Sequence, residues 1–190
     1  EKNKYTDLTL NSKFDTPPLA LGSANDYSFS PTADEIAFVM NDSDFLATST
    51  NNDVYIMKLS DVKENEATPF KKISISEGND TQPVYSPDGK YIAYTSMERA
   101  GFEADKQRIT LYNRLNGNTI DLSGKYDFSA GELVWSTDSK TIYFTAANKI
   151  YNSIYAIDVN TKLTSTLVES VVASSLQLSV DGKTLFFKNQ

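Results

Sequence analysis

The segment Val84-Tyr-Ser-Pro-Asp-Gly-Lys-Tyr-Ile-Ala-Tyr94 carries the clearest structural signal in this chain. Proline fixes φ at about −65° and glycine tolerates a positive φ, so the Ser-Pro-Asp-Gly-Lys run predicts a tight hairpin turn. After the turn, Ile92 and Tyr94 alternate with Ala93, which is the period of a strand with one buried face. The segment is therefore expected to be a β-hairpin.

Three other segments resemble this hairpin, at residues 27–38, 134–144 and 178–187. Each contains a turn serine, and these serines recur at intervals of about 43 to 56 residues, near the roughly 40 to 50 residues of a four-stranded propeller blade. The four equivalent residues are Ser30, Ser86, Ser136 and Ser179. No base accompanies any of them, so they are assigned to the turns and not to catalysis.

The segments between the repeats supply the remaining strands of each blade. Third strands are predicted over residues 53–60, 107–115 and 152–160, and fourth strands over residues 68–74, 118–123 and 163–169. No segment has the pattern of a long amphipathic helix, so the predicted class is all-β.

The predicted architecture is a single partial β-propeller of four-stranded antiparallel blades. Blades are expected at residues 27–75, 82–123 and 132–169, with the start of a further blade at 176–190 and a strand (5–10) plus linker within residues 1–26. An isolated β-sandwich is the alternative that regular strand spacing allows. The internal repeat favours the propeller.

Three complete blades form an arc, whereas closed propellers usually contain about four to eight blades. Apolar residues at the open end, such as Leu176, Leu185 and Phe187, are expected to be exposed unless something covers them. We therefore expect either further blades in the parent protein or self-association through the open blade edges.

The composition excludes several functions. The chain contains no histidine and no cysteine, so a Ser/His/Asp relay and an imidazole or thiolate metal site are excluded; neither a metal nor a cofactor is expected. Its 25 acidic residues outnumber 18 basic ones, and no basic cluster exists to bind nucleic acid. No apolar run is long enough for a membrane span, and the first residues lack the apolar core of a secretory signal. By itself, the chain is expected to be noncatalytic.

Two segments that connect second and third strands narrow the interpretation further. Residues 46–55 and 97–108, together with 14–18 and 82–90, resemble the propeller of the prolyl oligopeptidase family of serine peptidases, especially dipeptidyl-peptidase V and acylaminoacyl-peptidase-like enzymes. The run Arg99-Ala-Gly-Phe-Glu-Ala-Asp-Lys106 is the most specific part. The resemblance implies a hydrolase domain elsewhere in a periplasmic or secreted parent peptidase, with a cytoplasmic location as the alternative.

The resemblance also implies a role for this propeller segment. It would gate the access of peptide substrates to the hydrolase domain and place polar groups near the peptide amino terminus, since carboxylates and amide oxygens bind a cationic amine. The candidates are Glu103, Asp105 and Arg99 on one loop, and Asn51 and Asp53 on the equivalent loop of the preceding blade. Both loops are expected on one face of the propeller.

Structural roles are the alternative for the same residues. Asp105 would pair with Arg99 or Arg108, and Asn51 and Asp53 would bond to their own loop backbone. A propeller glycosidase using Glu103 and Asp105 is also considered.

Other readings concern the whole chain or residues outside these loops. A TolB-like protein-binding propeller without peptidase activity is the alternative function. Trp135, Tyr85 and Tyr143 are interpreted as core and not as a sugar platform. The cluster Asn41, Asp42 and Asp44 is interpreted as a solvated turn and not as a calcium site.

Overall fold

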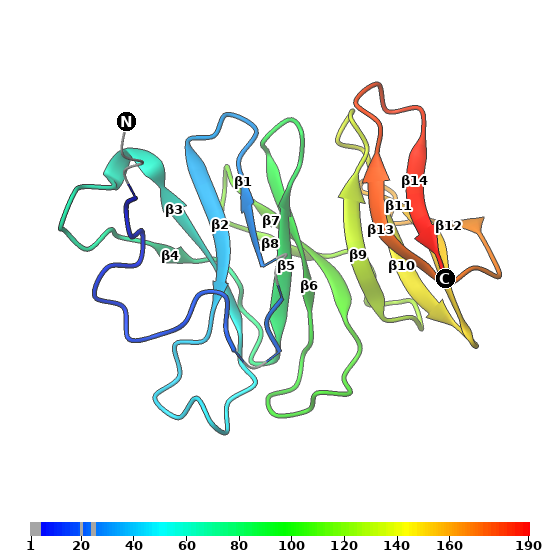
Figure 1. The fold of residues 1–190 in the computed structure, drawn as a ribbon. Coiled ribbons are helices and arrows are strands. Elements are labelled where there is room, and N and C mark those ends of the chain that lie inside the picture. Colours follow the sequence, from blue (N-terminus) through cyan, green and yellow to red (C-terminus); the bar gives the residue numbers. More distant parts are fainter. Residues whose placement is uncertain (1–4, 20, 24–25) are drawn as a thin grey trace.

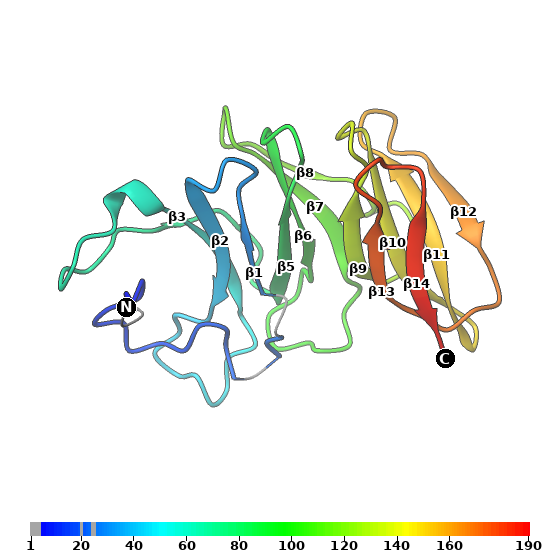
Figure 2. The same ribbon diagram turned by 45° about the horizontal axis from the view of Figure 1, so that its top comes forward.

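A computed structural model of the chain describes residues 5–19, 21–23 and 26–190, and it shows antiparallel sheets standing side by side in chain order (Figures 1 and 2). Blade A comprises β1 (Tyr27–Phe29), β2 (Glu35–Met40), β3 (Asp53–Lys58) and β4 (Lys71–Lys72), with the short 3-10 helix η1 (Leu59–Asp61) after β3. Blade B comprises β5 (Asp80–Tyr85), β6 (Tyr91–Ser96), β7 (Arg108–Asn113) and β8 (Thr119–Asp121). Blade C comprises β9 (Ala130–Trp135), β10 (Thr141–Asn148), β11 (Tyr151–Asp158) and β12 (Thr164–Val168). Hairpin D comprises β13 (Ala173–Leu178) and β14 (Leu185–Asn189).

This architecture confirms the predicted partial propeller. In each of blades A to C the strand order follows the chain order, as the repeat requires. Strand ends lie within a few residues of their predicted positions, except that β4 is confined to Lys71–Lys72.

The turn serines hold the hairpin between the first two strands of each repeat. The hydroxyl of Ser86 donates to Asp88 Oδ1 at 2.7 Å and accepts the Tyr91 N–H at 2.9 Å. Ser136 and Ser179 repeat both contacts within their own turns. Gly89 has a φ of +69°, a conformation that glycine adopts without strain. The serines are therefore structural, as expected.

The predicted leading strand over residues 5–10 is wrong. The described residues 5–19 contain no strand, and residues 8–11 form a turn in which the Asp7 carboxylate accepts the Thr9 N–H at 2.9 Å. Leu8 and Phe14 pack instead on the apolar face of blade A. This side-chain packing and the turn at Asp7 replace the extended conformation that the sequence suggested. Residues 1–4, 20 and 24–25 of the predicted linker lie outside the described residues.

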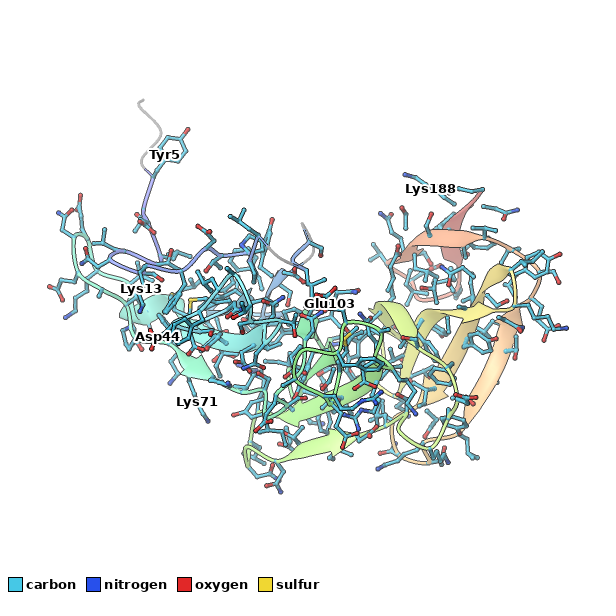
Figure 3. All side chains as sticks on the ribbon, turned by 90° about the horizontal axis from the view of Figure 1, so that it is seen from below. Tyr5, Lys13, Asp44, Lys71, Glu103 and Lys188 are labelled. Carbon is cyan, nitrogen blue, oxygen red and sulfur yellow. The ribbon has the colours of Figure 1, made fainter. Side chains whose placement is uncertain are left out.

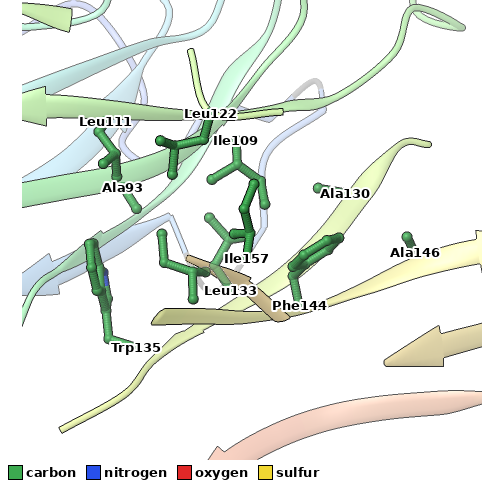
Figure 4. Close-up of a cluster of buried hydrophobic side chains, with 11 residues drawn as sticks. Ala93, Ile109, Leu111, Leu122, Ala130, Leu133, Trp135, Phe144, Ala146 and Ile157 are labelled. Carbon is green, nitrogen blue, oxygen red and sulfur yellow. The ribbon is translucent and has the colours of Figure 1, made fainter. Parts of the chain in front are cut away.

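Blades B and C share the largest apolar core, shown in Figure 4. Trp135 is 7% exposed, and its indole N–H donates to the Val84 carbonyl of blade B at 3.2 Å. Ile142 is its cross-strand partner on β10, so Tyr143 points to the opposite face of that strand. Trp135 and Tyr143 therefore form no common platform. Trp135 and Tyr85 belong to the core as expected, whereas Tyr143 is only half-buried.

Two carboxylates, the buried Glu35 and the half-buried Glu132, link consecutive blades at their seams. Glu35 of blade A accepts the Tyr85 hydroxyl of blade B at 2.9 Å and pairs with Arg114 at 3.0 Å. Glu132 of blade C accepts the backbone N–H groups of Ser175 and Leu176 in hairpin D at 2.9 and 2.7 Å. These contacts explain why the blades dock in one register.

The open end is partly covered by the chain itself. Leu176, expected to be exposed, is buried against Ile154 and Ala173, whereas Leu185 and Phe187 are half-buried. Figure 2 shows hairpin D alongside blade C, which accounts for this cover.

Candidate functional site

Two long loops project from the same end of the arc, opposite the serine turns (Figure 1). They connect β2 to β3 (residues 41–52) and β6 to β7 (residues 97–107), whereas the equivalent connection in blade C is a short turn at residues 149–150. The loops touch, because the Gly101 N–H donates to Thr50 Oγ1 at 3.1 Å. The expectation that both loops share one face is confirmed.

Asp105 organises its own loop. Its Oδ1 accepts from the Arg99 guanidinium at 2.8 Å, and its Oδ2 accepts the backbone N–H groups of Glu98 and Arg99 at 3.1 and 3.0 Å. The hydrogen bond from Arg99 holds the pKa of this carboxyl well below its usual range. Arg99 in turn lies 4.0 Å from the centre of the Phe102 ring. Asp105 and Arg99 thus satisfy each other, as the structural alternative predicts.

Asp53 lies beneath the loops and not on their surface. Its carboxylate is fully buried, accepts the Ser74 hydroxyl at 2.7 Å, and pairs with Lys72 from β4. Asn51 is half-buried, and its amide donates to Asp53 Oδ2 at 3.3 Å. Burial raises the pKa of Asp53 above its ordinary value. The structural alternative predicted that both side chains bond to their own loop backbone. Instead, Asn51 bonds to Asp53, and Asp53 joins the loop to β4, the outer strand of blade A.

Glu103 is exposed and makes no hydrogen bond or ion pair with any described residue. Figure 3, which views this end of the molecule, labels it on the β6–β7 loop. Phe45, Leu46 and Phe102 expose apolar side chains on the same two loops. Of the five predicted site residues, Glu103 is the carboxylate left available to a ligand.

Asp80, at the start of β5, was not recognised in the sequence. It is fully buried, and neither carboxylate oxygen accepts a hydrogen bond of normal geometry, although the Ser96 and Ser74 hydroxyls and the Lys72 charge lie close enough to act on it. Burial raises its pKa to about 7, and the nearby Asp53 charge acts in the same direction. A signal was present: alignment on the turn serines places Ala130 and Ala173 at the equivalent positions of the next two repeats.

Asn41 and Asp44 make their contacts within the loop or with the segment before blade A, and Asp42 lies near Tyr55 of β3. Asn41 is buried, so the predicted solvated turn is wrong for this residue. Asn41 Oδ1 accepts the Ser43 N–H at 3.1 Å, and Asp44 pairs with Lys13 at 2.9 Å. Within the described ranges, no group of three acidic, histidine or cysteine side chains is arranged to hold a metal ion. In the same ranges, no helix is long and apolar enough to cross a membrane.

Comparison with known proteins identifies relatives of this chain. In an alignment of 160 positions that covers 82% of this chain, the sequence is 32% identical to dipeptidyl-peptidase 5 of Porphyromonas gingivalis. The chain is a homologue of dipeptidyl-peptidase 5. The matched segment is 22% of that protein, and the chain spans about a fifth of the length of the curated relatives it matches. No protein-family model matches the sequence.

Solved structures support the propeller fold of the chain. TolB from Acinetobacter baumannii superposes with a TM-score of 0.64 at 24% identity, covering 84% of this chain and 36% of TolB. A puromycin-hydrolyzing peptidase from Mycobacterium tuberculosis superposes with a TM-score of 0.63 at 16% identity, covering 83% and 25%. At these identities the likeness shows the propeller fold alone. Together with the sequence match, it makes this chain a propeller segment related to peptidases.

Proposed function

We propose that this chain is part of the propeller of a serine exopeptidase, and that its loop face borders the route of peptide substrates to a hydrolase domain in the same protein. The homology to dipeptidyl-peptidase 5 supports this proposal. The two long loops also occur on one face, next to each other, with exposed apolar side chains that a peptide or a neighbouring domain would cover. The likeness to TolB concerns the fold and gives no reason to prefer the protein-binding alternative.

Glu103 is the proposed contact for the peptide amino terminus. A free carboxylate attracts a primary ammonium group, whereas Asp105 already has a cation and Asp53 is out of reach of solvent. The ordered loop below Glu103 reduces the entropy lost when a ligand binds, because Asp105 fixes the backbone of Glu98 and Arg99. The candidate site is therefore one acidic group on a preorganised loop.

The test is the Glu103→Gln variant of the full-length protein. Cleavage rates are compared for a dipeptidyl anilide with a free amino terminus and for its N-acetylated counterpart. We expect kcat/KM for the free-amine substrate to fall about tenfold, chiefly through KM, because a partly exposed charged contact is lost. The acetylated substrate should be unaffected.

The matched control is Glu66→Gln, which makes the same change of charge in the connection between η1 and β4. Glu66 is exposed and pairs with Lys63 at 3.2 Å, away from the loop face. Equal losses for both substrates, or no loss in Glu103→Gln, would contradict the anchoring role.

A further inference from the structure

The chain between β4 and β5 contacts the base of both long loops. We call residues 76–80, which end in the first residue of β5, the strap. On one side the strap meets Met97, the first residue of the β6–β7 loop. On the other side it meets Asn52, the last residue of the β2–β3 loop. The strap therefore joins two loops that belong to different blades.

The strap packs backbone against backbone on the start of the β6–β7 loop. The Met97 N–H donates to the Asn79 carbonyl at 3.0 Å, and the Ser76 hydroxyl donates to the Met97 carbonyl. At Gly78, a Cβ atom would lie 2.5 Å from the Met97 carbonyl oxygen, which is too close for any side chain. This end of the loop is thus fixed to the strap.

The same strap holds the end of the β2–β3 loop through a buried pair of amides. Asn79 Oδ1 accepts from Asn52 Nδ2 at 2.8 Å, and the Asp80 N–H donates to the Asn52 carbonyl at 2.8 Å. Asn79 is 6% exposed and Asn52 is 1% exposed. Hydrogen bonds shielded from water in this way are stronger than exposed ones and hold their groups in one geometry.

A second connection joins the loops nearer their tips. It is the hydrogen bond from the Gly101 N–H to Thr50 Oγ1 at 3.1 Å, two residues before Glu103. The loops are therefore tied at the base and again near the tip. At the base, Asn79 contacts both loops at once, through its carbonyl on one side and its side chain on the other.

We propose that Asn79 is a positioning residue for Glu103, and that the strap makes the two loops one unit. The inference rests on the proposed contact of Glu103 with the peptide amino terminus. Glu103 forms no hydrogen bond or ion pair with a described residue, so its position follows from the loop backbone. Loosening that backbone raises the entropy lost on binding, which weakens substrate binding and leaves the chemical step unchanged.

The first test is hydrogen exchange in the full-length Asn79→Ala variant. The amides of Met97 and Gly101 should both exchange about fivefold faster or more, because the loops loosen together. The Gly101 amide is the informative one, since its partner is Thr50 and not Asn79. Exchange in β10, which lies in blade C, should stay unchanged and shows that the fold is intact.

Asn113→Ala is the matched control. Asn113 pairs with Tyr91 at the end of blade B that carries the serine turn, and its side chain accepts the Leu115 N–H at 2.9 Å. The chemical change is the same, but the affected connection lies at the opposite end from the loops. Exchange at Met97 and Gly101 should therefore not change in this variant.

The second test compares the dipeptidyl anilide that has a free amino terminus with its N-acetylated counterpart. In Asn79→Ala, KM for the free-amine substrate should rise about three- to fivefold with kcat unchanged, and the acetylated substrate should be unaffected. Thr50→Val, which removes the connection near the tips, should have a similar effect. In the double variant, the rise in KM should stay below the product of the two single effects, because both changes loosen one unit.

Thr50→Val also decides the matter if Asn79→Ala does not fold, because faster exchange at the Met97 amide in this variant requires coupled loops. Unchanged exchange at Gly101 in folded Asn79→Ala, or at Met97 in Thr50→Val, would overturn the coupling. Unchanged KM in Asn79→Ala, where Glu103→Gln does raise KM, would overturn the positioning role alone. A null result for Glu103→Gln would instead remove the anchoring role, and with it the positioning role, while the exchange data would still decide whether the strap couples the loops.

Discussion

Removing the buried Asp80 charge should change how the stability of this chain depends on pH. The pKa of Asp80 is raised to about 7 in the folded state, mainly by burial, against about 3.9 in an unfolded chain. Between these values the folded protein keeps a proton that the unfolded chain releases. The stabilisation is therefore complete below about pH 4 and is lost as the pH rises through about 7.

The size of the effect follows from the two pKa values. The free energy of unfolding should decrease by about 1.4 kcal/mol per pH unit in this window, or about 2 to 3 kcal/mol between pH 5 and pH 7.5. Asp80→Asn has no carboxyl proton to lose and stays neutral across this range. Its stability relative to the natural sequence should therefore rise by this amount over the same range.

The assay is urea unfolding at pH 5.0 and pH 7.5, followed by the fluorescence of Trp135, the single tryptophan of the sequence. Asp61→Asn in η1 is the matched control, because Asp61 is exposed; its effect should stay within about 0.5 kcal/mol at both pH values. Burial also raises the pKa of Asp26 and of Asp53, which contribute with the same sign, so the comparison between variants isolates Asp80. Parallel pH profiles for Asp80→Asn and the natural sequence would refute the reasoning.

Two further predictions concern the seams between blades. Arg114→Met leaves the buried Glu35 without its cation and should lower the free energy of unfolding, measured by urea titration, by about 3 kcal/mol. An effect below about 1 kcal/mol would show that the ion pair between Glu35 and Arg114 does not hold blades A and B together. Glu132→Ala removes the acceptor of the Ser175 and Leu176 N–H groups, costing about 2 kcal/mol, and should accelerate hydrogen exchange at these two amides at least tenfold while exchange in β6 stays unchanged. Unchanged exchange at both amides would show that hairpin D is held by other contacts.

The repeat and its turns could be predicted because their determinants are local. Ser86, Asp88 and Gly89 lie within one turn, and the hydrogen bond from Ser86 to Asp88 and the φ preference of Gly89 are set inside that turn. The alternation of side chains between the two faces of a strand then locates the strands on either side of the turn. The leading strand was wrong because its extended pattern competed with packing of Leu8 and Phe14 onto blade A, which no local pattern records.

The candidate site was predictable only in part. The loops share a face because every blade has the same topology, so sequence spacing sufficed to place Glu103, Asp105 and Asn51 there. Within one loop, the pairing of Asp105 with Arg99 could be anticipated as an alternative.

The environments of Asp53 and Asp80 were decided by the tertiary structure. Asp53 meets Lys72 only because β4 returns to pair with β3, and Asp80 is enclosed only where blade B packs against blade A. A sequence states which groups can ionise and which turns the backbone prefers. The loss of water around a carboxylate, which sets its pKa and its need for a cation, depends on surfaces that distant segments bring together.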